Sequence, residues 1–202
     1  AMRQYSPRDS RRVRGVRLRR RSPIAANSHG VNKLPDSLKP VRFTRPVPDS
    51  VLLLTELLTP DRIRVPLVAT DKPAALRELT QMLAERLFID AEALLGPVLE
   101  RERMLSTGIG HGIAIPHAKS SLVSELSLVA GSSPGGVPFD ALDGEPVRLF
   151  FLLIGPESGA GQHVKALSRI ARLVRRESIR GALFAAPTAD DFHRLLVEAE
   201  ER

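Results

Sequence analysis

The segment of residues 149–154 constrains the fold more than any other part of the chain. It reads Leu-Phe-Phe-Leu-Leu-Ile and contains no polar residue. A short, wholly apolar run bounded by turn residues is typical of a central strand that is buried on both faces. Each face of such a strand must be covered by another layer, and helices on both sides of a sheet provide that cover.

Sequence patterns around this strand predict further helices and strands from residue 47 onwards. Apolar residues recur at helical spacing after Asp71, which is suited to capping a helix, and Pro73 is tolerated in a first helical turn. The predicted strands lie near 64–68, 125–132 and 147–154, and the predicted helices lie at 52–58, 70–89, 90–103, 162–175 and 188–201. This order predicts an α+β fold with a single domain, in which helices flank a mixed β-sheet in a three-layer α/β/α arrangement.

The helix predicted at 90–103 contains an unfavourable pair of residues. Asp90 is suited to cap its start, but Gly96 and Pro97 follow inside the helix. Proline lacks an amide hydrogen and its ring crowds the preceding turn, so we expect this pair to kink or interrupt the helix. The last helix has a more regular start, because Thr188 precedes Asp191 at the spacing of a capping box.

Positive charge is concentrated at the N-terminal end of the chain. Residues 1–46 contain 13 Lys/Arg against 2 Asp/Glu, a balance of +11, whereas residues 47–202 contain 17 against 21, a balance of −4. Residues 1–46 have too few apolar side chains to offset the entropy of ordering, so we expect a disordered basic extension. We do not expect nucleic acid as its partner, because no aromatic residues are interleaved with the arginines for base stacking.

The composition excludes several classes of site. The chain contains no cysteine, which excludes disulfides, thiolate zinc sites and cysteine nucleophiles. The longest apolar runs, 149–154 and 51–54, are far too short to span a bilayer. We therefore expect a soluble, cytoplasmic protein without a membrane span.

The stretch STGIGHGIAIPHAKS, residues 106–120, holds two of the five histidines. Its glycines follow the pattern G-x-G-x-G, which matches neither a dinucleotide fingerprint nor a P-loop. His117 follows Pro116, and the restricted backbone predicts a strand that leads into a stiff turn with the histidine at its end, as suits a nucleophile. His163 falls in the first turn of a predicted helix, where free N–H groups favour anions such as a phosphoryl group.

A metal site is the main alternative for these histidines. His111, His117 and His163 could in principle form a three-histidine zinc site. The six-residue spacing between the first two is not a familiar ligand spacing such as H-E-x-x-H. We therefore predict no metal site and no cofactor.

The longer stretch ERERMLSTGIGHGIAIPHAK, residues 100–119, resembles the active-site stretch of a known family. The family comprises the enzyme IIA components of the phosphoenolpyruvate-dependent phosphotransferase system, mannitol/fructose type, and STGIG-x-GIAIPH is most similar to its nitrogen-regulatory branch. The similarity extends from about Leu52 to the C-terminus, roughly three-quarters of the 202 residues. It includes PFDALDGEPVRLFFLLIGP and HVKALSRIARL in the expected order.

This resemblance implies roles for three residues. His117 would accept the phosphoryl group, His163 would be the second active-site histidine that hydrogen-bonds near it, and Arg101 would help to neutralise the phosphoryl charge. The neighbouring Arg103 does not fit the pattern, which places the arginine three residues before Met104. A neutral imidazole with a pKa near ~6.5 is nucleophilic and releases a phosphoryl group readily, as a reversible carrier requires.

Two expectations concern the surroundings of His117. Backbone N–H groups around residues 112–118 are expected to stabilise the transferring group, and an apolar rim of Ile109, Ile113 and Ile115 is expected to exclude water. His111 stands where nitrogen-branch members commonly have Asn. It either tunes partner choice or phosphohistidine lifetime, or is simply tolerated at an exposed turn.

The leading hypothesis is a phosphocarrier of the nitrogen-regulatory type. A histidine-containing phosphocarrier protein would phosphorylate His117 reversibly, and the phosphorylation state would regulate target proteins without direct binding of a small-molecule substrate. One alternative is a sugar-transport IIA component that passes phosphate to a separate fructose- or mannitol-type IIB protein. Another is a non-catalytic regulator whose basic arm binds nucleic acid.

Overall fold

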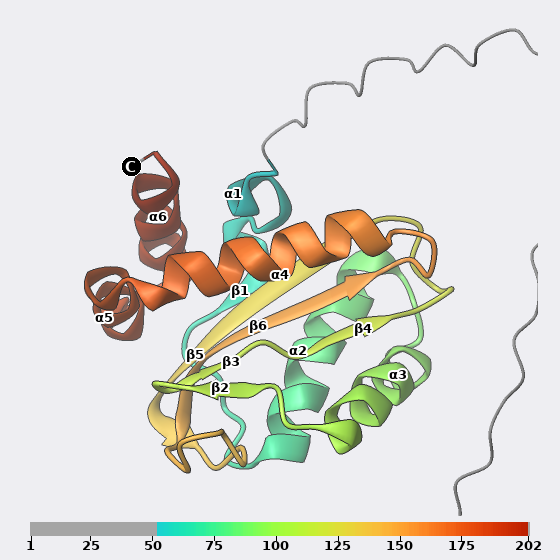
Figure 1. Cartoon of the computed structure of the whole chain (residues 1–202), viewed down its shortest axis with the longest axis horizontal. Helices are drawn as coiled ribbons and strands as arrows, with labels where there is room; N and C mark the ends of the chain where they lie inside the picture. The colour runs from blue at the N-terminus through green and yellow to red at the C-terminus, as the bar shows by residue number, and fades with distance from the viewer. Residues whose placement is uncertain (1–51, 202) are drawn as a thin grey trace, which may run out of the picture. The chain divides into compact units, whose positions relative to one another are not determined.

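The structure is a computed structural model that describes residues 52–201. The basic extension predicted for residues 1–46 lies outside the described residues. Residues 52–201 form one domain, in which helices lie on both sides of a β-sheet (Figure 1). The predicted α+β class and the three-layer arrangement are therefore confirmed.

A mixed sheet of six strands forms the middle layer. Its strands are β1 (Ile63–Arg64), β2 (Gly108–Gly110), β3 (Ile113–Ala114), β4 (His117–Lys119), β5 (Ser127–Val137) and β6 (Val147–Gly155). The order is β1-β5-β6-β3-β2, and β4 also pairs with β6. The pairs β5/β6 and β2/β3 are antiparallel, whereas β1 runs parallel to β5, and β3 and β4 run parallel to β6.

Helices cover both faces of this sheet. They are α1 (Leu54–Leu57), α2 (Lys72–Leu87), α3 (Ala91–Met104), α4 (Ala160–Arg175), α5 (Glu177–Ala185) and α6 (Ala189–Glu200), and a 3₁₀ turn spans Pro60–Arg62. Alternate residues of β6 enter two separate hydrophobic clusters. Phe150 and Leu152 pack with α2 and α3, whereas Phe151 and Leu153 pack with α4, α5 and α6. Burial on both faces is the reason that residues 149–154 are apolar throughout.

Three helices begin where the sequence predicts a cap. The side chains of Asp71, Asp90 and Thr188 each accept a hydrogen bond from the backbone N–H three residues later. Each bond satisfies one of the donors that the first turn of a helix leaves unpaired. The predicted starts of α2, α3 and α6 are confirmed.

The sequence predicted a kink or an interruption at Gly96 and Pro97 in the helix at 90–103, and the interruption is wrong. Helix α3 is continuous, and Pro97 lies inside it. Pro97 removes one amide donor from the helix, but Leu94 and Val98 on either side of it are buried in the core. The burial of this apolar face outweighs the loss of a single helical hydrogen bond.

Two other elements differ from the sequence prediction. The strand predicted near 64–68 is only the two-residue β1, because Pro66 cannot donate to a sheet, although the N–H of Leu67 still bonds to Ser132. Helix α5 has no counterpart in the prediction, and its N-cap residue, Arg176, makes no capping side-chain bond. Within residues 52–201, no helix combines the length and the apolar character that a bilayer crossing requires.

We expect Phe151→Ala to lower the free energy of unfolding by about 3–5 kcal/mol, because the ring is fully buried between β6 and α6 and its loss leaves a cavity. Urea unfolding followed by circular dichroism measures the change. Phe88→Ala is the matched control, since Phe88 is 96% exposed and its removal should cost less than about 0.5 kcal/mol. Equal losses for the two variants would contradict the proposed core.

Candidate functional site

His117 is the first residue of strand β4. The sequence predicted instead that His117 would lie in a turn at the end of a strand. Strands β3 and β4 pair with successive residues of β6, and Ile115 and Pro116 separate them. Pro116 has no amide hydrogen to donate, although its carbonyl oxygen accepts a hydrogen bond from the N–H of Leu153 in β6 at 2.9 Å. The carbonyl oxygen of Ile115 is bonded instead by the imidazole of His117.

The two hydrogen bonds of the His117 imidazole fix its tautomer. Nδ1 lies 2.9 Å from the carbonyl oxygen of Ile115, which can only accept, so Nδ1 carries the hydrogen. Nε2 accepts a hydrogen bond of 3.2 Å from Nε of Arg101, so Nε2 carries the lone pair. Burial lowers the pKa of His117 and the Arg101 charge adds to the lowering, although the bond to Ile115 raises it. The ring is neutral near pH 7, and Nε2 is its nucleophilic nitrogen.

Arg101 is held in place at the end of α3. Its Nη1 donates to the carbonyl oxygen of Leu105 at 2.9 Å. The next residue, Glu102, is buried and accepts hydrogen bonds from the backbone N–H and the hydroxyl of Thr107. Glu102 also pairs with Lys72 at 2.8 Å. A buried carboxylate with these partners fixes the connection from α3 to β2, and with it the direction in which Arg101 points.

His163 lies beside His117, in the first turn of α4, and is only 5% exposed. The centroids of the two rings are 5.8 Å apart and their planes meet at 60°. Between these two described rings there is no hydrogen bond, and within residues 52–201 the buried Nδ1 of His163 has no partner. Burial, with smaller effects of the charges of His117 and Lys119, lowers the pKa of His163 to about 4.

Glycine at position 155 allows this close packing. A Cβ atom at Gly155 would lie 2.9 Å from Nδ1 of His163 and 3.0 Å from a methyl group of Leu126. Both separations are too short, so the imidazole of His163 can rest on strand β6 only because Gly155 has no side chain.

The three residues predicted for the site line one cavity of about 450 Å³. Arg103, the neighbouring candidate, is exposed and is not among the lining residues, which favours Arg101. The other lining residues come from α3, β4 and α4, and they are Pro97, Glu100, Met104, Ala118, Lys119, Val164 and Leu167. The cavity thus combines two imidazoles, two cationic side chains and the carboxylate of Glu100 with apolar walls.

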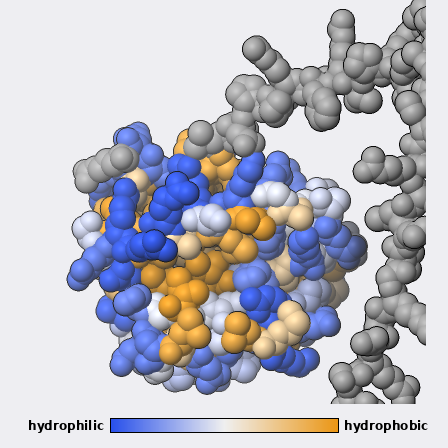
Figure 2. All heavy atoms as spheres, viewed as in Figure 1, coloured by the Kyte–Doolittle hydropathy of each residue, from blue (hydrophilic) through white to orange (hydrophobic). Residues whose placement is uncertain are grey.

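The predicted apolar rim is wrong in its residues, because Ile109, Ile113 and Ile115 are all absent from the lining of the cavity. Ile113 and Ile115 are buried in the hydrophobic cluster on the α4 side of the sheet. The backbone N–H of Ile115 is also not available to a ligand, since it donates to Thr107. The exposed apolar side chains that line the cavity are Met104 and Val164, at 73% and 62% exposure. A hydrophobic area occupies the centre of the molecular face seen in Figure 2.

His111 lies at a turn and outside this cavity. Its φ angle is +55°, it is exposed, and its backbone N–H donates to Asp143 at 2.7 Å. In the part of the chain that the structure describes, no group of three or more His, Cys, Asp or Glu side chains is placed to hold a metal ion. The three-histidine zinc site therefore has no support, because His111 does not join the other two histidines.

Comparison with known proteins identifies the family. Residues 56–199 match the family model described as "Phosphoenolpyruvate-dependent sugar phosphotransferase system, EIIA 2". The chain belongs to this family. Its EIIA proteins are phosphotransferases, so the cavity around His117 lies in a phosphoryl-transfer protein. The resemblance predicted from residues 100–119 is confirmed.

Individual relatives include regulatory and sugar-transport proteins. This EIIA chain is 36% identical over 152 residues to the nitrogen regulatory protein of Pseudomonas aeruginosa, a match that covers 74% of the chain and 98% of the relative. It is 38% identical over 138 residues to the fructose-specific EIIABC component of Bacillus subtilis. That match covers 68% of the chain and 22% of the relative, so the chain spans about a fifth of that protein.

Solved structures agree with these matches. The crystal structure of the nitrogen regulatory protein IIA-Ntr from Neisseria meningitidis superposes with a TM-score of 0.67 at 29% identity. That alignment covers 71% of the EIIA chain and 98% of the other chain. The crystal structure of IIA mannitol from Escherichia coli aligns with a TM-score of 0.60 at 22% identity, over 68% and 97% of the two chains, and shows a shared fold.

The structure adds Lys119 to the residues of this EIIA site. Lys119 lines the cavity, and its charge contributes to the low pKa of His163. The sequence held a signal for it, because residues two apart on a strand point to the same side and Lys119 follows His117 by two. The anchoring of α3 by Lys72 and Glu102 gave no such signal, since these residues lie far apart in the sequence.

We expect Arg101→Gln to raise the pKa of His117, because the variant removes a neighbouring positive charge that disfavours the imidazolium form. Titration of the histidine resonances by NMR measures the change. Arg103→Gln is the matched control, since Arg103 lies on the same helix but outside the cavity. An unchanged pKa of His117 in Arg101→Gln would contradict the Arg101–His117 contact.

His163 should make folding stability depend on pH. Its pKa is about 4 in the folded protein and about 6.5 in the unfolded chain, so the unfolded state binds more protons between these values. Stability should therefore fall as the pH falls from about 6.5 to about 4, by up to about 3 kcal/mol from this residue. His163→Gln should lose less stability than wild type over this range. Carboxylates titrate in both proteins and should affect both curves of unfolding free energy against pH equally. Parallel curves for wild type and His163→Gln would therefore refute the contribution assigned to His163.

Proposed function

We propose that the chain is a phosphocarrier that accepts a phosphoryl group on Nε2 of His117. The observation that carries the proposal is the orientation of the His117 ring: Nδ1 is hydrogen-bonded to Ile115, and the lone pair of Nε2 is directed at Arg101. A neutral imidazole with a free lone pair attacks phosphorus without first losing a proton. Burial keeps that form dominant near pH 7, as the lowered pKa of His117 indicates.

The transfer can be written with its electrons balanced. The Nε2 lone pair of His117 forms the new P–N bond, while the P–N bond to the donor histidine breaks and its electron pair returns to the donor ring. No proton leaves Nε2, and the hydrogen on Nδ1 stays in its bond to Ile115. Arg101 gives up its bond to Nε2 and turns its donors to the phosphoryl oxygens, where charge accumulates in a loose transition state.

Four further residues of the cavity support this step. Lys119 adds a second positive charge to the cavity wall. The low pKa of His163 keeps its ring neutral, so it does not release a proton to the phosphoryl group. Met104 and Val164 at the rim can exclude water when a partner docks, which slows hydrolysis of the phosphohistidine.

The nitrogen-regulatory role is the first choice among phosphotransferase functions. The relatives named nitrogen regulatory protein from Pseudomonas aeruginosa and Bradyrhizobium diazoefficiens match the chain over 98% and 94% of their own lengths. The donor would be a histidine-containing phosphocarrier protein, and the outputs would be regulatory target proteins in the cytoplasm. The second candidate is transfer to a separate IIB protein, which is supported by the 38% identity to a fructose-specific component.

The direct test is phosphorylation with radiolabelled phosphoenolpyruvate and the purified upstream phosphotransferase proteins. Wild type should be labelled and His117→Ala should not. His111→Ala is the matched control, because His111 lies in the same glycine-rich stretch but outside the cavity, and it should be labelled like wild type. Equal labelling of His117→Ala and wild type would refute the assignment.

Transfer experiments separate the two candidates. A purely regulatory carrier should keep its label when mixed with a purified fructose- or mannitol-type IIB protein, and only its binding to regulatory targets should change with phosphorylation. Rapid appearance of the label on the IIB protein would favour the transport role. Binding of nucleic acid that is lost when residues 1–46 are deleted would favour the non-catalytic alternative.

A further inference from the structure

A cluster of arginines gives one part of the domain a local positive charge, although the domain as a whole is acidic. Residues 47–202 contain 17 Lys/Arg against 21 Asp/Glu, but residues 169–180 contain five arginines against one acidic residue. The arginine cluster spans the end of α4 and the first half of α5, and consists of Arg169, Arg172, Arg175, Arg176 and Arg180. A positive surface on an otherwise acidic domain attracts anions locally.

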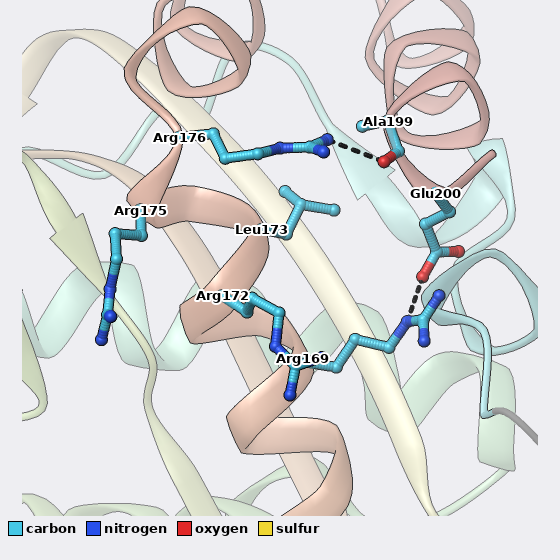
Figure 3. A pocket seen from close by; sticks show the side chains of 7 residues that line it. All are labelled: Arg169, Arg172, Leu173, Arg175, Arg176, Ala199 and Glu200. Atoms are coloured by element: carbon cyan, nitrogen blue, oxygen red, sulfur yellow. Dashed lines mark hydrogen bonds and ion pairs between the residues drawn. The ribbon is translucent and has the colours of Figure 1, made fainter. Parts of the chain in front are cut away.

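Four of these arginines line a cavity of about 480 Å³ between α4 and α6, together with Leu173, Ala199 and Glu200. Figure 3 shows Arg169 and Arg176 extending from α4 towards α6 on either side of Leu173. Arg172 lies between them along α4. The volume lies within the range of sites that bind small molecules.

The one carboxylate in the cavity does not neutralise the cluster. Glu200 accepts hydrogen bonds from the backbone N–H groups of Leu54 and Thr55 and from the hydroxyl of Thr55. Only Nε of Arg169 bonds to it, at 2.6 Å. Within residues 52–201 the two terminal nitrogens of Arg169 make no hydrogen bond, so they remain as donors at the edge of the cavity.

Helix stabilisation explains some of the arginines but not all. Positive side chains near a helix C-terminus interact favourably with the helix dipole, and they can donate hydrogen bonds to the last carbonyl groups of the helix. Arg180 does this for Val174 and Arg175, and Arg176 bonds to the carbonyl oxygen of Ala199. Arg172 is exposed, and among residues 52–201 it makes neither a hydrogen bond nor an ion pair. Its charge is therefore free to bind a ligand.

We propose that this cavity binds a small molecule that carries a chain of two or more phosphate groups, at a site separate from His117. Guanidinium groups recognise phosphate oxygens through paired N–H donors. Arg172 lies between Arg169 and Arg176, which are seven positions apart, about 10 Å along the helix axis, and this is more than one phosphate group can bridge. Leu173 and Ala199 form an apolar wall that can contact an organic part of the ligand.

The test is a titration of the full chain with inorganic triphosphate, ADP and orthophosphate, followed by ¹⁵N–¹H NMR and calorimetry. Triphosphate and ADP should shift the amide resonances of residues 172–176 and 199–200, and should bind at least tenfold more tightly than orthophosphate. Arg172→Gln should weaken this binding at least tenfold. The matched control is Arg64→Gln, because Arg64 is exposed on β1 and outside the cavity, and it should bind like wild type.

Other outcomes would overturn the proposal. Shifts confined to the surroundings of His117, or loss of binding in Arg101→Gln, would place the anion in the phosphoryl-transfer site. Binding that Arg172→Gln leaves unchanged would place it elsewhere, for example on the basic residues 1–46. Equal affinity for triphosphate and orthophosphate would show general electrostatic attraction instead of a built site.

Discussion

The imidazole of His117 is oriented by one hydrogen bond, from Nδ1 to the carbonyl oxygen of Ile115 at 2.9 Å. Pro116 lies between β3 and β4 and donates no hydrogen bond to β6, but its carbonyl oxygen accepts one from the N–H of Leu153 at 2.9 Å, so the segment stays attached to the sheet. The sheet fixes the backbone on both sides of Pro116. The sheet therefore holds the His117 side chain rigidly, and the hydrogen bond at Nδ1 fixes the direction of Nε2, its nucleophilic nitrogen.

The second constraint is the position of the positive charge. Arg101 lies opposite Nε2 because Glu102, its neighbour in the sequence, is anchored by Thr107 and Lys72. The anchoring carboxylate is buried, so its loss would leave Lys72 without its buried partner and would loosen the end of α3. The Lys72–Glu102 ion pair at the end of α3 thus helps to hold Arg101 beside His117.

Much of this arrangement was predictable because the local chemistry of the sequence is consistent with the fold. The apolar run of residues 149–154 predicted a strand covered on both faces, and the caps at Asp71 and Asp90 predicted where two helices begin. The family resemblance pointed to His117, His163 and Arg101, and the structure places all three at one cavity.

The failures have physical causes. Pro97 does not interrupt α3, because tertiary burial of the neighbouring leucine and valine outweighs a local preference. Ile113 and Ile115 were expected at the rim but lie in the core. The sequence pattern does not show which face of the sheet these two side chains occupy. The rim is instead supplied by Met104 and Val164, from two helices that only the fold brings together.

The proposed phosphorylation of Nε2 of His117 can be checked by identifying the nitrogen atom that receives the phosphoryl group. Phosphorylation of protein labelled with ¹⁵N-histidine, followed by ¹⁵N and ³¹P NMR, identifies this atom. We expect a single phosphohistidine, with the phosphoryl group on Nε2 of His117 and a proton on Nδ1. Phosphorylation on Nδ1 of His117, or on another histidine, would contradict it.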